Sequence, residues 1–382
     1  MHVERLFWTA PDAGALKKLA QVKPDLVFYF GSREALASGA AFKQLKAMCP
    51  EAIVMGCTTG GQIQGDDAVD DEIAGVAIRF DATKIRLVSA TIDCAADSGR
   101  CGNNIGEGLS AEDLAGVFVL SDGLNVNGSA LVAGIVQIIG DRVPLTGGLA
   151  GDGSKFEETL VGADFPPRSH VVAAIGFYGK AIRIGHGSAG GWDVFGPWRR
   201  ITRSQGNVLF ELDNEPALDL YERYLGDEAA GLPGSGLLFP LQINDPNSPE
   251  HEIVRTILAI DRDQRSLTFA GDVPEGWRAQ LMRGNFDRLS DGAADAARQA
   301  TRDVVNLDGA NGVALLISCI GRRLLMGQRV SEEIEAAGAI LGTGLNRLGF
   351  YSYGEISPHA ASGICELHNQ TMTITTITEA AA

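Results

Sequence analysis

Residues 25–61 read DLVFYFGSREALASGAAFKQLKAMCPEAIVMGCTTGG, and the fold prediction starts from this stretch. The apolar, aromatic run Asp25–Phe30 has the composition of a buried strand, and it ends at Gly31. Ser32 and an Ala-, Leu- and Lys-rich segment follow, which is typical of a capped helix. A second apolar run, Ala52–Met55, then ends in a glycine-rich turn. The stretch therefore predicts a strand–helix–strand unit.

The same pattern recurs further along the chain. Val117–Leu120 predicts a strand, Ser129–Ile139 a helix, and Val143–Thr146 another strand that again ends in a glycine-rich segment. Between the two units, the runs Ile73–Phe80 and Ile85–Thr91 are separated by four turn-forming residues, which predicts an antiparallel hairpin. Parallel units combined with a hairpin indicate a mixed sheet.

The length of 382 residues exceeds the usual size of one hydrophobic core, so two domains are expected. The pattern changes near residue 207, and the Gly-rich segment 231–236 is typical of a joint. We predict an α/β fold of two domains with mixed sheets flanked by helices. The first domain is expected at residues 1–210, and the second, at residues 211–382, is expected to be more α+β in character.

Composition excludes several classes of function. The formal net charge of −16 disfavours binding to nucleic acid or to anionic lipid. The six cysteines show no CxxC spacing, so neither a zinc site nor a disulfide framework is indicated. Apolar runs are too short to span a membrane, and the N-terminus lacks the pattern of a signal peptide. We therefore expect a cytoplasmic protein with reduced thiols.

Glycine-rich turns directly follow three of the predicted strands. In α/β sheets, ligands gather beyond the carboxyl ends of strands, where such turns expose backbone N–H groups. None of the turns matches GxGxxG or GxxxxGK[ST], so a nucleotide is not indicated, and glycine alone also serves sharp turns. The candidate binding residues in and beside these turns are Cys57, Thr58, Thr59, Gly60, Gly61, Ser121, Asp122, Gly147, Gly148, Gly151 and Asp152, with Trp192 in a later glycine turn and Cys319 at the end of another strand.

Arg322 and Arg323 follow a predicted strand in a sequence that has few cations. A guanidinium there could bind a carboxylate in bidentate fashion, and Glu355 could bind an ammonium group. This pairing of Arg322 with Glu355 suggests an amino-acid-like zwitterion as the ligand. The competing interpretation is an internal Arg–Glu salt bridge that stabilises the fold.

Two further chemistries are alternatives. Cys57 or Cys319 could act as a nucleophile in a cysteine-dependent hydrolase, provided that a base lies beside the thiol. Haem could be bound through a histidine, although no haem attachment motif is present. The candidate haem ligands are His186, His359 and His368.

At these motifs the sequence resembles the FIST family, whose halves are the FIST N and FIST C domains. The resemblance rests on the order of several short segments along nearly the whole chain rather than on any one of them. These segments are Gly56–Ile63, Ser121–Gly123, Thr146–Asp152, Gly191–Pro197, Ser318–Arg322, Gly349–Ile356 and Leu367–Thr371.

The resemblance implies a sensory protein rather than an enzyme, which binds a small ligand such as an amino acid. It also implies a separate signalling partner such as a histidine kinase, because the length leaves no room for an output domain. Some relatives of similar length are haem-binding nitric oxide sensors, so haem and nitric oxide form the alternative ligand pair.

Overall fold

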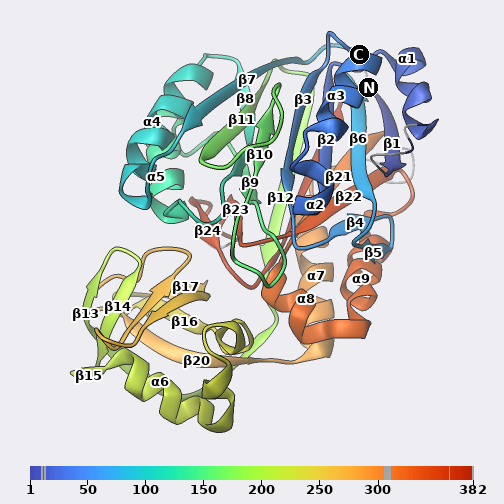
Figure 1. Cartoon of the computed structure of the whole chain (residues 1–382). Coiled ribbons are helices and arrows are strands. Elements are labelled where there is room, and N and C mark those ends of the chain that lie inside the picture. Colours follow the sequence, from blue (N-terminus) through green and yellow to red (C-terminus); the bar gives the residue numbers. More distant parts are fainter. Residues whose placement is uncertain (10–11, 13, 305–310, 361, 381–382) are drawn as a thin grey trace.

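The computed structural model describes residues 1–9, 12, 14–304, 311–360 and 362–380. It is a mixed α/β structure in two domains, as predicted (Figure 1). The larger domain, the main body, contains three sheets, and the smaller domain contains one sheet formed by residues 192–284.

The first sheet of the main body contains the strand–helix–strand unit predicted from residues 25–61. Its two strands pair in parallel, and short helices cover the outer face of the sheet. The strand order is β1 (His2–Trp8), β6 (Ile73–Arg79), β2 (Leu26–Gly31), β3 (Ile53–Thr58) and β10 (Val161–Ala163), and the helices are α1 (Leu19–Val22), α2 (Arg33–Leu36) and α3 (Ala40–Met48).

The second sheet contains the other predicted unit, in which strands β8 and β9 are again parallel. Its order is β24 (Cys365–His368), β23 (Gly354–Pro358), β9 (Leu145–Leu149), β8 (Leu114–Ser121), β11 (Val171–Tyr178) and β7 (Lys84–Thr91), and it packs against α4 (Ser98–Leu109) and α5 (Gly128–Ile139).

The third sheet joins strands from distant parts of the chain. Its order is β12 (Ile182–Ala189), β25 (Met372–Glu379), β21 (Gly312–Cys319), β22 (Leu345–Ser352), β4 (Gln62–Gln64) and β5 (Asp67–Val69). The helices α7 (Phe286–Ala300) and α9 (Ser331–Leu341) pack beside it, and α8 (Ile320–Met326) follows β21.

The inner faces of the three sheets meet in one hydrophobic core. Phe28 of the first sheet lies 5.0 Å, ring centre to ring centre, from Phe118 of the second, and Phe30 lies 4.6 Å from Phe350 of the third. Since each sheet is covered by the other two on this side, the strands can be apolar along their whole length, as β2 is.

The smaller domain has a hydrophobic core of its own. Its strands are β17 (Ser248–Arg255), β16 (Leu241–Asp245), β20 (Arg278–Gly284), β13 (Trp192–Gln205), β14 (Val208–Leu212), β19 (Ser266–Phe269) and β18 (Ile257–Asp261), with β15 (Glu215–Pro216) beside β14 and helix α6 (Ala217–Leu225). In Figure 1 it lies below the main body, next to β23 and β24.

Two expectations need comment. The hairpin predicted from residues 73–91 is wrong, because β6 pairs with β1 and β2 in the first sheet whereas β7 pairs with β11 in the second. β6 is almost entirely buried and suits a central position, while β7 alternates between exposed and half-buried residues, as an edge strand does. The domain boundary predicted after residue 210 lies inside β14 and does not coincide with the division between the sheets. The domain limits 1–210 and 211–382 therefore stay a prediction.

Candidate functional site

A groove of about 430 Å³ opens on the main body beyond the carboxyl ends of strands β2, β3 and β9, where α8 also begins. This is the kind of position where ligands bind in α/β sheets. Hollows of about 490, 500 and 550 Å³ on the smaller domain are larger, but none of them is lined by residues of these strand ends. The groove is lined by Ser32, Arg33, Glu34, Thr59, Gly60, Gly61, Gln62, Asp70, Asp152, Gly153, Ser154, Ile320, Arg323, Leu324 and Gly327.

The floor of the groove is the glycine turn after β3. The N–H of Gly60 donates to the carbonyl of Tyr351 at 2.8 Å, which fixes this turn to β22. A Cβ on Gly61 would lie 1.6 Å from Nη1 of Arg323, and Gly61 has a φ of +122°. Glycine is therefore required at position 61 both for the backbone conformation and for the close approach of Arg323.

Arg323 carries a positive charge along one wall. Its guanidinium donates to both carboxylate oxygens of Asp70, at 2.7 and 2.8 Å, and also to the carbonyl of Gly60. The same group lies 5.2 Å from the ring centre of Tyr351, within the range of a cation–π contact. These contacts hold the guanidinium in place while 19% of the side chain remains exposed.

A second guanidinium, that of Arg33, also lines the groove together with carboxylates. Arg33 pairs with Glu157 at 2.7 Å, and its side chain is 22% exposed. Asp152 accepts hydrogen bonds from the N–H groups of residues 156–158 and from the hydroxyl of Tyr353. Asp152 therefore shapes the loop at residues 152–158, part of which lines the groove. The groove as a whole offers both charge signs within one small volume.

Four of the predicted site residues line this groove, namely Thr59, Gly60, Gly61 and Asp152. Gly151 lies next to the glycine turn, since a Cβ on Gly151 would be 3.3 Å from the backbone nitrogen of Gly60. The others lie away from the groove. Cys57 and Thr58 are buried in β3, Ser121 and Asp122 are buried at the end of β8, and Gly147 and Gly148 are interior residues of β9. Asp122 accepts hydrogen bonds from five donors, including the N–H of His170, and so fixes local turns.

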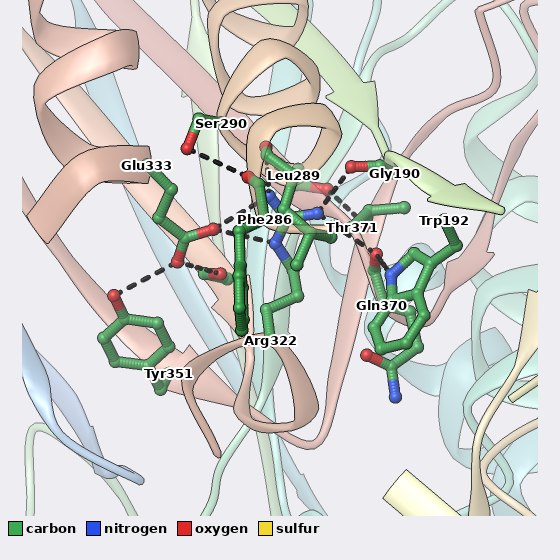
Figure 2. Close-up of polar contacts among 12 residues, drawn as sticks. Gly190, Trp192, Phe286, Leu289, Ser290, Arg322, Glu333, Tyr351, Gln370 and Thr371 are labelled. Carbon is green, nitrogen blue, oxygen red and sulfur yellow. Dashed lines mark hydrogen bonds and ion pairs between the residues drawn. The ribbon is translucent and has the colours of Figure 1, made fainter. Parts of the chain in front are cut away.

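Arg322 does not face Glu355 across a binding site, so the zwitterion pair suggested by the sequence is corrected. The side chains of Arg322 and Glu333 are 0% exposed and form an ion pair at 2.8 Å (Figure 2). The remaining guanidinium donors bind the carbonyls of Gly190, Leu289 and Gln370, so all five N–H groups are used inside the protein. The internal salt bridge is the interpretation that the structure supports, with Glu333 as the partner. Trp192 lies beside this network and donates to the Gln370 carbonyl.

Glu355 is buried next to the strand ends but outside the groove. Its carboxylate accepts from the hydroxyl of Ser352 at 2.7 Å and from the N–H and hydroxyl of Thr371. Burial raises the pKa of Glu355 to about 8, although these hydrogen bonds and the charge of Arg322 act in the opposite direction.

The cysteines proposed as nucleophiles are both buried. Burial raises the pKa of the Cys57 thiol and that of the Cys319 thiol far above the ordinary value. A thiol that stays protonated is a weak nucleophile, and neither cysteine lines the groove. The geometry therefore does not favour the hydrolase alternative.

The three histidines proposed as haem ligands also lie outside the groove. His368 is buried, with Nε2 3.0 Å from the carbonyl of Ser357, and burial lowers its pKa to about 4. His359 stacks on His368, while His186 lies on β12, where burial lowers its pKa.

The groove contains residues that were not among the candidate binding residues, chiefly Ser32, Arg33 and Asp70. Arg323 was named only together with Arg322, which was the arginine chosen as the candidate. Ser32 directly follows β2, in the same kind of position as the glycine turn after β3, and this was a usable signal. Asp70 belongs to an acidic run that is normally read as a solvated loop. The pairing of β5 with β4, and of β4 with β22, brings that run to the groove.

Three comparisons place the chain among known proteins. A family model of the FIST N domain matches residues 25–215, and a model of the FIST C domain matches residues 217–358. No curated protein matches the sequence. A solved structure of cyanuric acid hydrolase from A. caulinodans is similar at a TM-score of 0.41 with 9% identity, covering 100% of this chain and 99% of that one. None of the helices in the described ranges is both long and apolar enough to cross a membrane. Because the two domain models together span most of the sequence, the chain belongs to the FIST family of sensory proteins.

Proposed function

We propose that the chain is a sensor whose groove binds a small amino-acid-like molecule that carries a carboxylate and an ammonium group. FIST domains are sensory modules of signalling proteins. The observation that carries the proposal is the presence of two partly exposed guanidinium groups, Arg33 and Arg323, beside the carboxylates of Asp70 and Glu34 in one groove. A guanidinium suits a ligand carboxylate, and the acidic groups suit a ligand ammonium.

The position of the groove supports a signalling role. Its walls come from the FIST N segment at residues 32–34, 59–62 and 152–154, and from the FIST C segment at residues 320–327. A ligand that contacts both segments binds best in one arrangement of them. Such a difference in affinity between two conformations is the requirement for a ligand to shift a conformational equilibrium. We propose that a separate partner, such as a histidine kinase in the cytoplasm, detects that shift.

Ligand screening by thermal shift tests the proposal. A panel of amino acids, small dicarboxylates and haem is compared, and at least one amino acid is expected to stabilise the protein. At 100 times its Kd, a ligand should stabilise the fold by about 2.7 kcal/mol. Arg323→Met should weaken that ligand by about 10- to 100-fold, since a hydrogen bond to a charged group contributes about 1.5–3 kcal/mol.

The matched control is Arg298→Met, which removes an exposed arginine on α7 outside the groove lining. It should leave the affinity unchanged. Equal binding by the wild type and Arg323→Met would place the ligand elsewhere, and stabilisation by haem alone would favour the nitric oxide alternative over an amino acid.

A further inference from the structure

A second cluster of polar side chains lies at the contact between the two domains, well apart in the fold from the groove residues. His251 is on β17 of the smaller domain, whereas His359 directly follows β23 and Glu366 is on β24 of the main body. One ligand atom from each residue lies within 4.8 Å of the other two. Among the described residues, this is the group of histidine, cysteine and carboxylate side chains whose spacing suits a metal ion.

The geometry within the cluster is close to that of a metal site. Nε2 of His251 lies 3.0 and 3.1 Å from the two carboxylate oxygens of Glu366. The rings of His251 and His359 have centres 4.9 Å apart and are nearly perpendicular, at 82°. Ligand atoms of a tetrahedral zinc site are separated by about 3.4 Å, which follows from metal–ligand distances of about 2.0–2.1 Å. Movements of the three ligand atoms by about an ångström, through side-chain rotation, would therefore form the site.

We propose that His251, His359 and Glu366 bind a divalent transition metal, with Zn²⁺ as the best match. Two imidazole nitrogens and one carboxylate oxygen form a donor set that Zn²⁺ and Fe²⁺ accept, whereas Ca²⁺ and Mg²⁺ prefer oxygen ligands alone. A simple ion pair between His251 and Glu366 would not need the second imidazole. The inference does not depend on the ligand proposed for the groove.

The surrounding residues restrict the movement of the three side chains. The side chains of His251 and Glu366 are only 26% and 15% exposed. His251 packs edge-on against Trp277, and His359 stacks on the buried ring of His368 with ring centres 6.0 Å apart. The N–H of Ser362 lies 3.4 Å from Nδ1 of His359, a long contact that would be lost if Nε2 bound the metal, because Nδ1 would then carry the ring proton.

Three protein ligands leave at least one coordination position open. Glu366 also lines a neighbouring cavity of about 390 Å³, whose walls come from α5 and β24 of the main body and from β17 and Trp277 of the smaller domain. A bound metal would thus connect the two domains at the edge of this cavity. Occupancy of the metal site would restrain movement of the smaller domain relative to the main body.

Zinc titration of the metal-free full-length chain, in competition with a chromophoric chelator, tests this site. One Zn²⁺ per chain is expected for the wild type. His251→Gln, His359→Gln and Glu366→Gln should each weaken binding at least tenfold, while His2→Gln, which changes an exposed histidine on β1, should not. Parallel titrations with Fe²⁺, Ca²⁺ and Mg²⁺ establish the preference of the site.

Two further measurements distinguish loss of metal ligands from loss of folding. Melting of each metal-free variant shows whether the fold persists, and the visible spectrum of Co²⁺-loaded wild type reports nitrogen and oxygen ligands directly. Wild type that binds no Zn²⁺ or Fe²⁺ under these conditions, or triad variants that are folded and bind as tightly as wild type, would overturn the proposal.

Discussion

Replacing Arg322 with methionine is expected to lower the free energy of unfolding by about 3–5 kcal/mol. The reason is that Glu333 would remain as a buried charge without its cationic partner, since both side chains are inaccessible to solvent. Glu333 would keep hydrogen bonds from the hydroxyls of Ser318 and Tyr351, which only partly compensate for a lost guanidinium. Chemical denaturation of purified wild type and variant at one pH measures the difference.

The double variant Arg322→Met with Glu333→Leu separates charge from packing. It removes both charges, so it should recover a substantial part of the stability lost in the single variant. Recovery should be incomplete, because the carbonyls of Gly190 and Leu289 and the hydroxyl of Tyr351 also lose partners (Figure 2). Removal of an exposed ion-pair partner by Arg298→Met should cost less than about 1 kcal/mol.

A loss below about 1 kcal/mol in Arg322→Met would mean that the ion pair is not buried in solution. The arginine would then be available for a ligand, as the sequence suggested. The same denaturation experiments, repeated with an amino-acid ligand of the groove, would show whether that ligand depends on Arg322 or on Arg323.

The contrast between Arg322 and Arg323 shows how far sequence reasoning reached. The pattern around residues 318–323 indicated a strand end with cations beyond it, and this is where β21 ends and the groove lies. Neighbouring residues at the start of a helix point in different directions, however, so one arginine enters the interior and the other the groove. That choice depends on Glu333 of α9, which is brought there by tertiary packing and carries no local signal.

The sequence did not predict which distant strands share a sheet, for a related reason. Local patterns correctly predicted the parallel pairs β2–β3 and β8–β9, because each lies within one strand–helix–strand unit. The pairing of β4 with β22 joins residues nearly 300 positions apart, and no local pattern in either segment predicts its partner strand. Since the groove is built at such junctions, its glycine turn was predictable and its full lining was not.

The difference in stability between Glu355→Gln and wild type should change by several kcal/mol between pH 5 and pH 9, in favour of the variant as pH rises. The carboxyl group has a pKa of about 8 in the folded protein, above its ordinary value of 4.5, because burial disfavours the charged form. A group whose pKa is raised on folding contributes its full stability below the unfolded pKa. That contribution declines as pH rises from about 4.5 and is lost above about 8, at about 1.4 kcal/mol per unit.

Glutamine cannot ionise, so the variant lacks this pH dependence, while all other titrating groups are shared and cancel in the difference. A constant offset is also expected, because glutamine has one acceptor oxygen in place of the two that accept from Ser352 and Thr371. The sign of the slope is therefore the decisive quantity rather than the stability at one pH. Urea unfolding of both proteins at pH 5, 7 and 9 measures it, with Glu112→Gln, at an exposed glutamate, as the control. A flat difference for Glu355→Gln would show that this carboxylate is charged in the folded protein throughout the range. The hydrogen bonds from Ser352 and Thr371, followed by the charge of Arg322, would then stabilise it.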